Sequence, residues 1–216
     1  MKKLSFTFAL IFLSNIAFAE NAMQLQISHF SSGNLDQWKS KKFSGKTDYQ
    51  IIQLNNTQVL KAESHSAASG LFKEQRIDLR KTPFLNWRWR IDNRLEKNNE
   101  QSKSGDDYSA RVYVVINGGW AFWKTKAINY VWASNTAKGS RWPNAFAGKN
   151  AMMIAVRSSE DKTHIWYQEK RNIMQDLKQH FGEGIHAIDA VALMTDTDNA
   201  QGTAIAYYSD IYFSAQ

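Results

Sequence analysis

The amino-acid sequence predicts a mostly β protein, a two-sheet antiparallel β-sandwich of the jelly-roll type with one short helix near residues 172–181. Two observations lead to this class. Short segments of alternating apolar and polar residues recur along the chain, and helical periodicity is confined to a single stretch. Strands that recur at such spacing are typical of sandwiches and jelly rolls.

The clearest strand is residues 85–91, where apolar and polar side chains alternate at every position. Successive side chains of a strand point to opposite faces. One face therefore carries Leu85, Trp87, Trp89 and Ile91, and the other carries Asn86, Arg88 and Arg90. Similar patterns predict strands at residues 49–54, 59–64, 108–116, 127–133, 151–157, 165–170, 187–195 and 203–213.

One segment has helical spacing instead. Ile173, Leu177 and Phe181 recur every four residues, Asn172 is a good N-cap, and Gly182 is a good C-cap. The sequence therefore predicts one helix between these caps.

Residues 92–107 are nearly all polar, so we expect a mobile loop there. Strand-like segments on both sides of this loop look like parts of one core. Residues 20–216 are accordingly expected to form a single domain.

The N-terminus has the features of a cleavable signal peptide at residues 1–19. Lys2 and Lys3 precede a mainly apolar run at residues 4–16, and Ala17-Phe18-Ala19 is an A-x-A cleavage site. The run of about 13 residues is too short, at roughly 1.5 Å per residue, to span a bilayer core of about 30 Å. We expect a periplasmic or extracellular protein without a transmembrane segment after cleavage.

The composition narrows the classes of partner. The net charge is +7, or +5 once Lys2 and Lys3 are removed, and the lysines are dispersed, which favours a solvated basic face over a dedicated anion-binding patch. Export argues against nucleic acid as the partner. Because the chain has no cysteine, its stability must come from a hydrophobic core.

Many ordered segments of the mature chain resemble a family of exported bacterial proteins catalogued as domain of unknown function 3047. The segments include Ala68-Ser69-Gly70-Leu71, Leu85-Asn86-Trp87-Arg88-Trp89, Gly105-Asp106-Asp107-Tyr108, Asn129-Tyr130-Val131-Trp132, Trp142-Pro143-Asn144, Glu169-Lys170-Arg171-Asn172 and Met194-Thr195-Asp196-Thr197-Asp198-Asn199. The resemblance implies no activity. A looser likeness, carried by Asp210-Ile211-Tyr212-Phe213, is to galactose-binding-type jelly rolls, and it concerns the fold alone.

The tryptophans have two interpretations. Trp87, Trp89 and Trp132 lie in alternating strands and are expected in the core. Trp120, Trp123 and Trp142 lie near glycines and a proline, in expected loops, where an indole could stack on a sugar ring or pack internally.

A polar strand face supplies the candidate ligand-binding residues. The acids just before the strand at 108–116 and Trp142 are added to this face. The full set is Arg88, Arg90, Asp106, Asp107, Arg111, Asn129, Trp142, Glu169 and Arg171. Arginine pairs carboxylates or hydroxyls through two parallel hydrogen bonds, which suits an acidic sugar or another anion. The alternative is an internal ion-pair network that fixes the fold.

The oxygen-rich segment 196–199 is a candidate metal site with Asp196, Asp198 and Asn199 as ligands. Calcium takes six to eight oxygen ligands from such loops. Turn formation by Asp and Asn explains the same residues without a metal. The sequence therefore predicts no cofactor, with a structural calcium ion as the exception to test.

The sequence favours a non-catalytic protein of the cell envelope that binds carbohydrate or a small polar ligand. A hydrolase of envelope glycans that uses paired carboxylates, and a protein–protein interaction module, are the alternatives. Serine-nucleophile and histidine-metal motifs are missing from the sequence.

Overall fold

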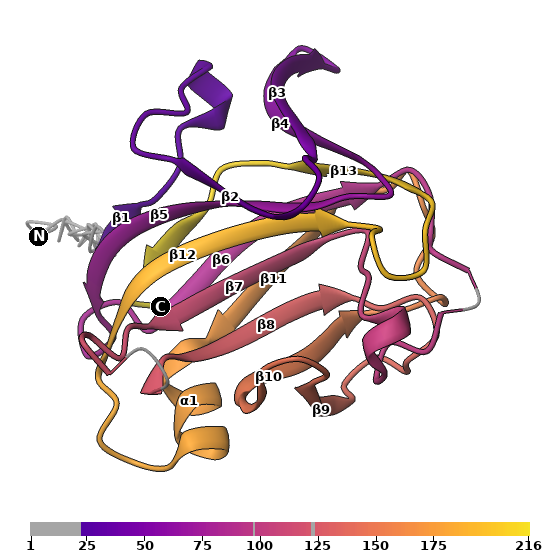
Figure 1. Cartoon of the computed structure of the whole chain (residues 1–216). Coiled ribbons are helices and arrows are strands. Elements are labelled where there is room, and N and C mark those ends of the chain that lie inside the picture. Colours follow the sequence, from indigo (N-terminus) through magenta and orange to yellow (C-terminus); the bar gives the residue numbers. More distant parts are fainter. Residues whose placement is uncertain (1–22, 97, 122–123) are drawn as a thin grey trace, which may run out of the picture.

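The computed structural model describes residues 23–96, 98–121 and 124–216, which form two packed β-sheets and one α-helix (Figure 1). The predicted signal peptide and its cleavage site lie outside these residues. None of the helices in the described part of the chain is long and apolar enough to cross a membrane.

Sheet 1 follows the order β1-β14-β6-β13-β4-β3, and β11 also pairs with β6. Its strands are β1 (Gln24–Gln26), β3 (Asp48–Leu54), β4 (Thr57–His65), β6 (Phe84–Ile91), β11 (Tyr167–Asn172), β13 (Thr203–Tyr208) and β14 (Tyr212–Ser214). All of their pairings are antiparallel. Gln24 of β1 is opposite Ser214 of β14, so the two ends of the described chain lie together.

Sheet 2 follows the order β2-β5-β12-β7-β8-β10-β9. Its strands are β2 (Lys39–Ser44), β5 (Ala68–Asp78), β7 (Arg111–Ile116), β8 (Lys126–Trp132), β9 (Arg141–Asn144), β10 (Gly148–Arg157) and β12 (Ala187–Asp196). Neighbours are antiparallel except β8 and β10, which run parallel. Parallel neighbours need a connection longer than a hairpin, and the segment that contains β9 supplies it.

The core lies between the sheets and contains the tryptophans that alternation assigns to it. Trp87 and Trp89 of β6 and Trp132 of β8 are fully buried, and the rings of Trp89 and Trp132 are 5.9 Å apart. The two-sheet fold and the placement of these three indoles are therefore as predicted.

The strands differ from the sequence-based expectation in two ways. The predicted strand at 203–213 is divided, because residues 209–211 leave the ladder and the Asp210 carboxylate accepts hydrogen bonds from Ser31. The strands β1, β2, β5 and β9 were not predicted. In β5 the first four residues are all buried, so both faces are covered and no alternation marks the strand.

The helix α1 (Ile173–Phe181) has the predicted caps. The Asn172 side-chain oxygen accepts a hydrogen bond from the Gln175 N–H at 3.0 Å. At the other end Gly182 adopts φ 81°, a conformation that glycine enters without a steric penalty, and its N–H bonds to the carbonyl of Lys178.

The described residues of the predicted loop at 92–107 form no strand, but the loop is anchored. Asn98 donates hydrogen bonds to the carbonyls of Gly105 and Asp107, at 2.9 and 3.1 Å. The buried Glu100 carboxylate accepts backbone N–H bonds from residues 134–136, which follow β8. These contacts hold the loop against the end of sheet 2.

Candidate ligand-binding cleft

Alternation along sheet 2 places a second set of side chains on the face away from the core. On β7, Val112 and Val114 pack into the core, so Arg111 and Tyr113 face outward. The register aligns Tyr113 with Asn129 of β8, which therefore shares this outer face.

A cleft of about 490 Å³ lies on this outer face, a size typical of ligand-binding sites. Six of the residues predicted to bind a ligand or metal line it: Asp106, Arg111, Asn129, Asp196, Asp198 and Asn199. Its aromatic walls come from opposite edges of the sheet. Phe43 of β2 is 59% exposed and Phe146, just after β9, is 57% exposed, while Tyr113 lies between them on β7.

Arg111 forms a buried network in the cleft floor. Its Nε donates to Asp196 Oδ1 at 2.9 Å, and its terminal nitrogen donates to the second Asp196 oxygen and to the Asp106 carbonyl oxygen at 2.6 Å. Its guanidinium lies 4.3 Å from the centre of the Tyr108 ring. Arg111 is only 6% exposed, and its second terminal nitrogen lies 3.9 Å from Asp106 Oδ2.

These buried charges shift one another's pKa values. Burial raises the pKa of Asp196 to about 7, although the positive charge of Arg111 opposes this shift. Burial by itself would lower the pKa of Arg111, but the negative charges of Asp196 and Asp106 outweigh it and raise that pKa.

Asp106 is the least satisfied acid of the cleft. It is 4% exposed, and its Oδ2 accepts a hydrogen bond from Asn144 Nδ2 at 2.9 Å. Within the described residues, its Oδ1 has no hydrogen-bond partner. A buried acceptor without a donor is costly, so a ligand that brings a donor to this oxygen would be stabilised.

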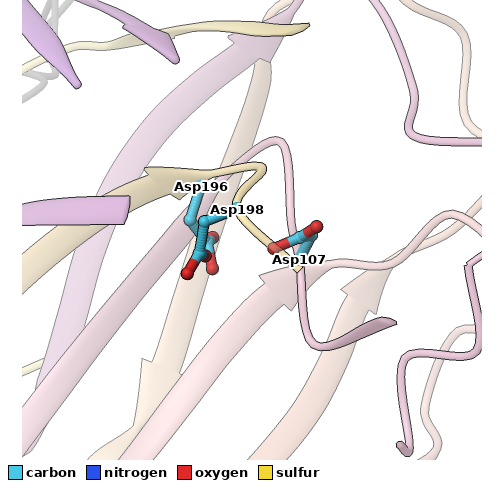
Figure 2. A group of neighbouring side chains, drawn as sticks. All are labelled: Asp107, Asp196 and Asp198. Atoms are coloured by element: carbon cyan, nitrogen blue, oxygen red, sulfur yellow. The ribbon is translucent and has the colours of Figure 1, made fainter. Parts of the chain in front are cut away.

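Asp107, Asp196 and Asp198 gather at one end of the cleft. Figure 2 shows Asp196 and Asp198 side by side at the end of β12, with Asp107 on the neighbouring loop. One carboxylate oxygen from each lies within 4.8 Å of the others, so the structure adds Asp107 to the acids of the predicted metal segment.

The contacts of these three acids leave few oxygens free for a calcium ion. Both oxygens of Asp196 accept hydrogen bonds from Arg111. Both oxygens of Asp107 accept N–H bonds, from Asn199 and Ala200. A calcium ion needs six to eight oxygens, and only Asp198 offers an oxygen that no described group already uses.

Other predicted ligand-binding residues lie elsewhere. Glu169 of β11 is buried beneath the core tryptophans, where it accepts hydrogen bonds from Arg157 Nε at 2.5 Å and from Trp89 Nε1 at 3.1 Å. Arg171 pairs with the buried Asp176 of α1, with its NH2 2.6 and 2.8 Å from the two carboxylate oxygens. Both residues belong to internal ion pairs, the alternative interpretation of the polar strand face.

Arg88 and Arg90 lie on the outer face of sheet 1, so the structure does not bring them together with Arg111. The guanidinium of Arg88 lies 5.5 Å from the centre of the Trp166 ring, and Arg90 pairs with Asp92 at 2.8 Å. The core face of β6 is occupied by apolar side chains, which leaves these arginines only the far side of the sheet.

The expectation of a loop around Trp142 is wrong. Trp142 lies in β9, is 4% exposed, and stacks on Tyr108 with ring centres 6.5 Å apart. Trp120 is in a loop and is 90% exposed. Trp123 lies outside the described residues.

Phe43, Tyr113, Phe146 and Asn144 of the cleft were not predicted. Alternation with Arg111 in the strand 108–116 could have identified Tyr113. Phe43 and Phe146 carried no such signal, because each lies at the edge of the sheet in a segment without clear periodicity.

Comparison with known proteins assigns the chain to a family. A family model described as "Protein of unknown function (DUF3047)" matches residues 36–212. No curated protein matches the chain in sequence.

Several solved structures of low sequence identity are similar to the chain. The family 30 carbohydrate-binding module of a cellulosomal cellulase from Clostridium thermocellum is similar with a TM-score of 0.50 and 9% identity, over 90% of this chain and 98% of that one. The family 11 module from the same organism, in complex with a β-1,3-1,4-mixed-linked tetrasaccharide, gives 0.48 and 10%, over 88% and 94%. For a carbohydrate-binding module studied for promiscuous specificity, the TM-score is 0.48 and the sequence identity is 9%. The match covers 85% of this chain but only 59% of that one.

Proposed function

Because this chain belongs to the DUF3047 family, whose description assigns no activity, we propose a function from its own residues: it binds carbohydrate in the cleft on sheet 2, without catalysis. The observation that carries the proposal is the joining of aromatic walls and a polar floor in one cleft. A carbohydrate-binding module of the same fold supports it.

The cleft chemistry matches the two kinds of surface on a sugar. Aromatic rings stack on the apolar faces of sugar rings, and Phe43, Tyr113 and Phe146 present such rings from three strands or strand ends. Asn129 and Asp106 on the floor supply hydrogen-bonding groups for hydroxyls.

The predicted signal peptide gives the cell envelope or its surroundings as the proposed location. Glycans of the envelope and of plant material are therefore the first ligands to test. This part of the proposal rests on residues 1–19.

The test is calorimetric titration of the mature protein with a panel of such glycans. We expect Phe43→Ala and Phe146→Ala each to weaken binding about tenfold, since a stacking contact contributes about 1.4 kcal/mol. Both side chains are exposed, so neither change should unfold the protein. Ile165→Ala, which removes an exposed apolar side chain outside the cleft lining, is the matched control. If all three variants bind with the affinity of the unchanged protein, any glycan must bind outside this cleft.

The hydrolase alternative needs a pair of carboxylates with free oxygens. Asp196 has the raised pKa of a general acid, but Arg111 holds both of its oxygens. Asp106 and Asp198 each have an oxygen that no described group uses, so they are the pair to test. If the protein binds without catalysis, no reducing ends are released from the glycans that bind. Release that Asp106→Asn abolishes would favour the enzyme.

A further inference from the structure

The charge of the cleft floor is opposite to that of the chain. The whole sequence carries +7, yet the charged residues that line the cleft are Asp106, Asp196, Asp198 and Arg111. Three acids against one base give the cleft lining an excess of acidic groups, although the chain as a whole is basic.

The charge of Arg111 is already paired with Asp196 and Asp106. Its Nε and terminal nitrogen donate to Asp196 and to the Asp106 carbonyl, and its guanidinium lies over Tyr108. The other cations at the cleft are Lys41 and Lys103, which lie over the rings of Phe43 and Phe146. Both lysines are exposed at the rim, where water and salt weaken their charge.

The floor instead offers acceptors that need a donor. Asp106 Oδ1 is buried without a hydrogen-bond partner, and Asp198 forms no ion pair among the described residues. Hydroxyls can donate to such oxygens, but an ammonium group donates three N–H bonds and also neutralises charge.

We propose that the cleft prefers glycans that carry free amino groups, such as de-N-acetylated amino sugars, over neutral and acidic glycans. This inference rests on the proposed function. The ammonium of one sugar residue lies against Asp106 and Asp198, while the ring faces of the glycan stack on Phe43 and Phe146.

The experiment compares β-1,4-linked oligomers of equal length made of glucose, N-acetylglucosamine, glucosamine or mannuronic acid. The first three share a backbone and differ at one substituent, so the amino group is tested alone. Titrations at about pH 6 keep the amine protonated. We expect the glucosamine oligomer to bind at least about tenfold more tightly than the glucose oligomer, and the mannuronic acid oligomer to bind most weakly.

Variants connect the preference to the floor. Asp106→Asn and Asp198→Asn should each reduce the preference for the glucosamine oligomer over the glucose oligomer severalfold. The half-exposed position of Asp198 keeps this test informative if Asp106→Asn fails to fold. Asp78→Asn is the matched control, because it removes the same charge far from the cleft. Asp78 lies ten residues along β5 from the cleft residue Ala68, which is about 33 Å in an extended strand.

The outcomes separate the two proposals. If neither the four oligomers nor any glycan of the wider panel binds, the proposed function and this inference are both overturned. Binding of the glucose oligomer without a gain for glucosamine, or a preference that survives both Asp→Asn changes, overturns only the inference. Loss of glucosamine binding on removal of calcium with a chelator also overturns it, because the acids would then hold a metal ion.

Discussion

Replacing Arg111 by methionine should destabilise the protein by about 3–5 kcal/mol. Arg111 and Asp196 are both nearly fully buried, so the substitution leaves a carboxylate without a counter-charge in a region of low dielectric. Two charged hydrogen bonds to Asp196 are lost, at about 1.5–3 kcal/mol each, which gives a sum of the same size.

The assay is urea unfolding followed by tryptophan fluorescence, with free energies from linear extrapolation. The Asp196→Asn variant and the double variant complete a thermodynamic cycle. We expect a coupling energy of about 2 kcal/mol, because the second substitution removes a charge that the first has left unpaired. Arg76→Met is the control: Arg76 pairs with Asp189 on the surface, and its loss should cost below about 1 kcal/mol.

A different result would refute the reasoning. If Arg111→Met costs about as little as the control, or if the two single changes add without coupling, then the pair does not act as a desolvated unit. Arg111 would then be accessible to ligands, and the acidic character assigned to the cleft floor would be lost with it.

The other predictions concern stability. Glu169→Gln should cost about 2–4 kcal/mol in urea unfolding, because it leaves the guanidinium of Arg157 buried with less counter-charge, and a cost below about 0.5 kcal/mol would contradict this. Asn172→Ala should cost about 1 kcal/mol through loss of the helix cap, with a matching fall in the melting temperature. Hydrogen bonds from Arg80 lower the pKa of Asp78 to about 2. The ionised Asp78 therefore stabilises the fold above about pH 4, and this stabilisation is lost as the pH falls toward 2. The stability of the Asp78→Asn variant should fall slightly less over that window than the stability of the unchanged protein, and the difference should be small because the Asp78–Arg80 pair is exposed. Chelation should leave the melting temperature unchanged, whereas a decrease that added calcium reverses would show that the acids at the end of β12 hold a metal.

Many of the strands could be predicted because each sheet buries one face in the core and exposes the other, which leaves an alternating pattern in the sequence. In β6 the alternation of apolar and polar residues is complete, and the strand forms where it was expected. In β5 it is absent at the start, where the strand is covered by the core on one side and by the cleft residues on the other. Periodicity reports burial on one face, so a strand that is buried on both gives no such signal.

The sequence could identify individual polar residues as site candidates, but it could not show which of them lie together in the folded protein. Alternation indicated that Arg88 and Arg111 lie on polar strand faces, but not to which sheet each strand belongs. Strand pairing places the two arginines on opposite outer surfaces of the sandwich. The partners of Arg111 and Arg171 follow from tertiary structure as well, because Asp196 is 85 residues away from Arg111 and Asp176 belongs to the helix that packs beside β11.

The pairing of β1 with β14 also affects when the protein can fold. Gln24 and Ser214 are opposite each other, and in the described chain β6, in the middle of sheet 1, pairs only with strands that lie between residues 167 and 214. A chain that is synthesised from its N-terminus cannot complete this sheet until those strands have been made. Contacts between such distant residues also form slowly, because a long loop must close first. The topology therefore delays folding until synthesis is nearly finished, so most of the chain is still unfolded while it is being made.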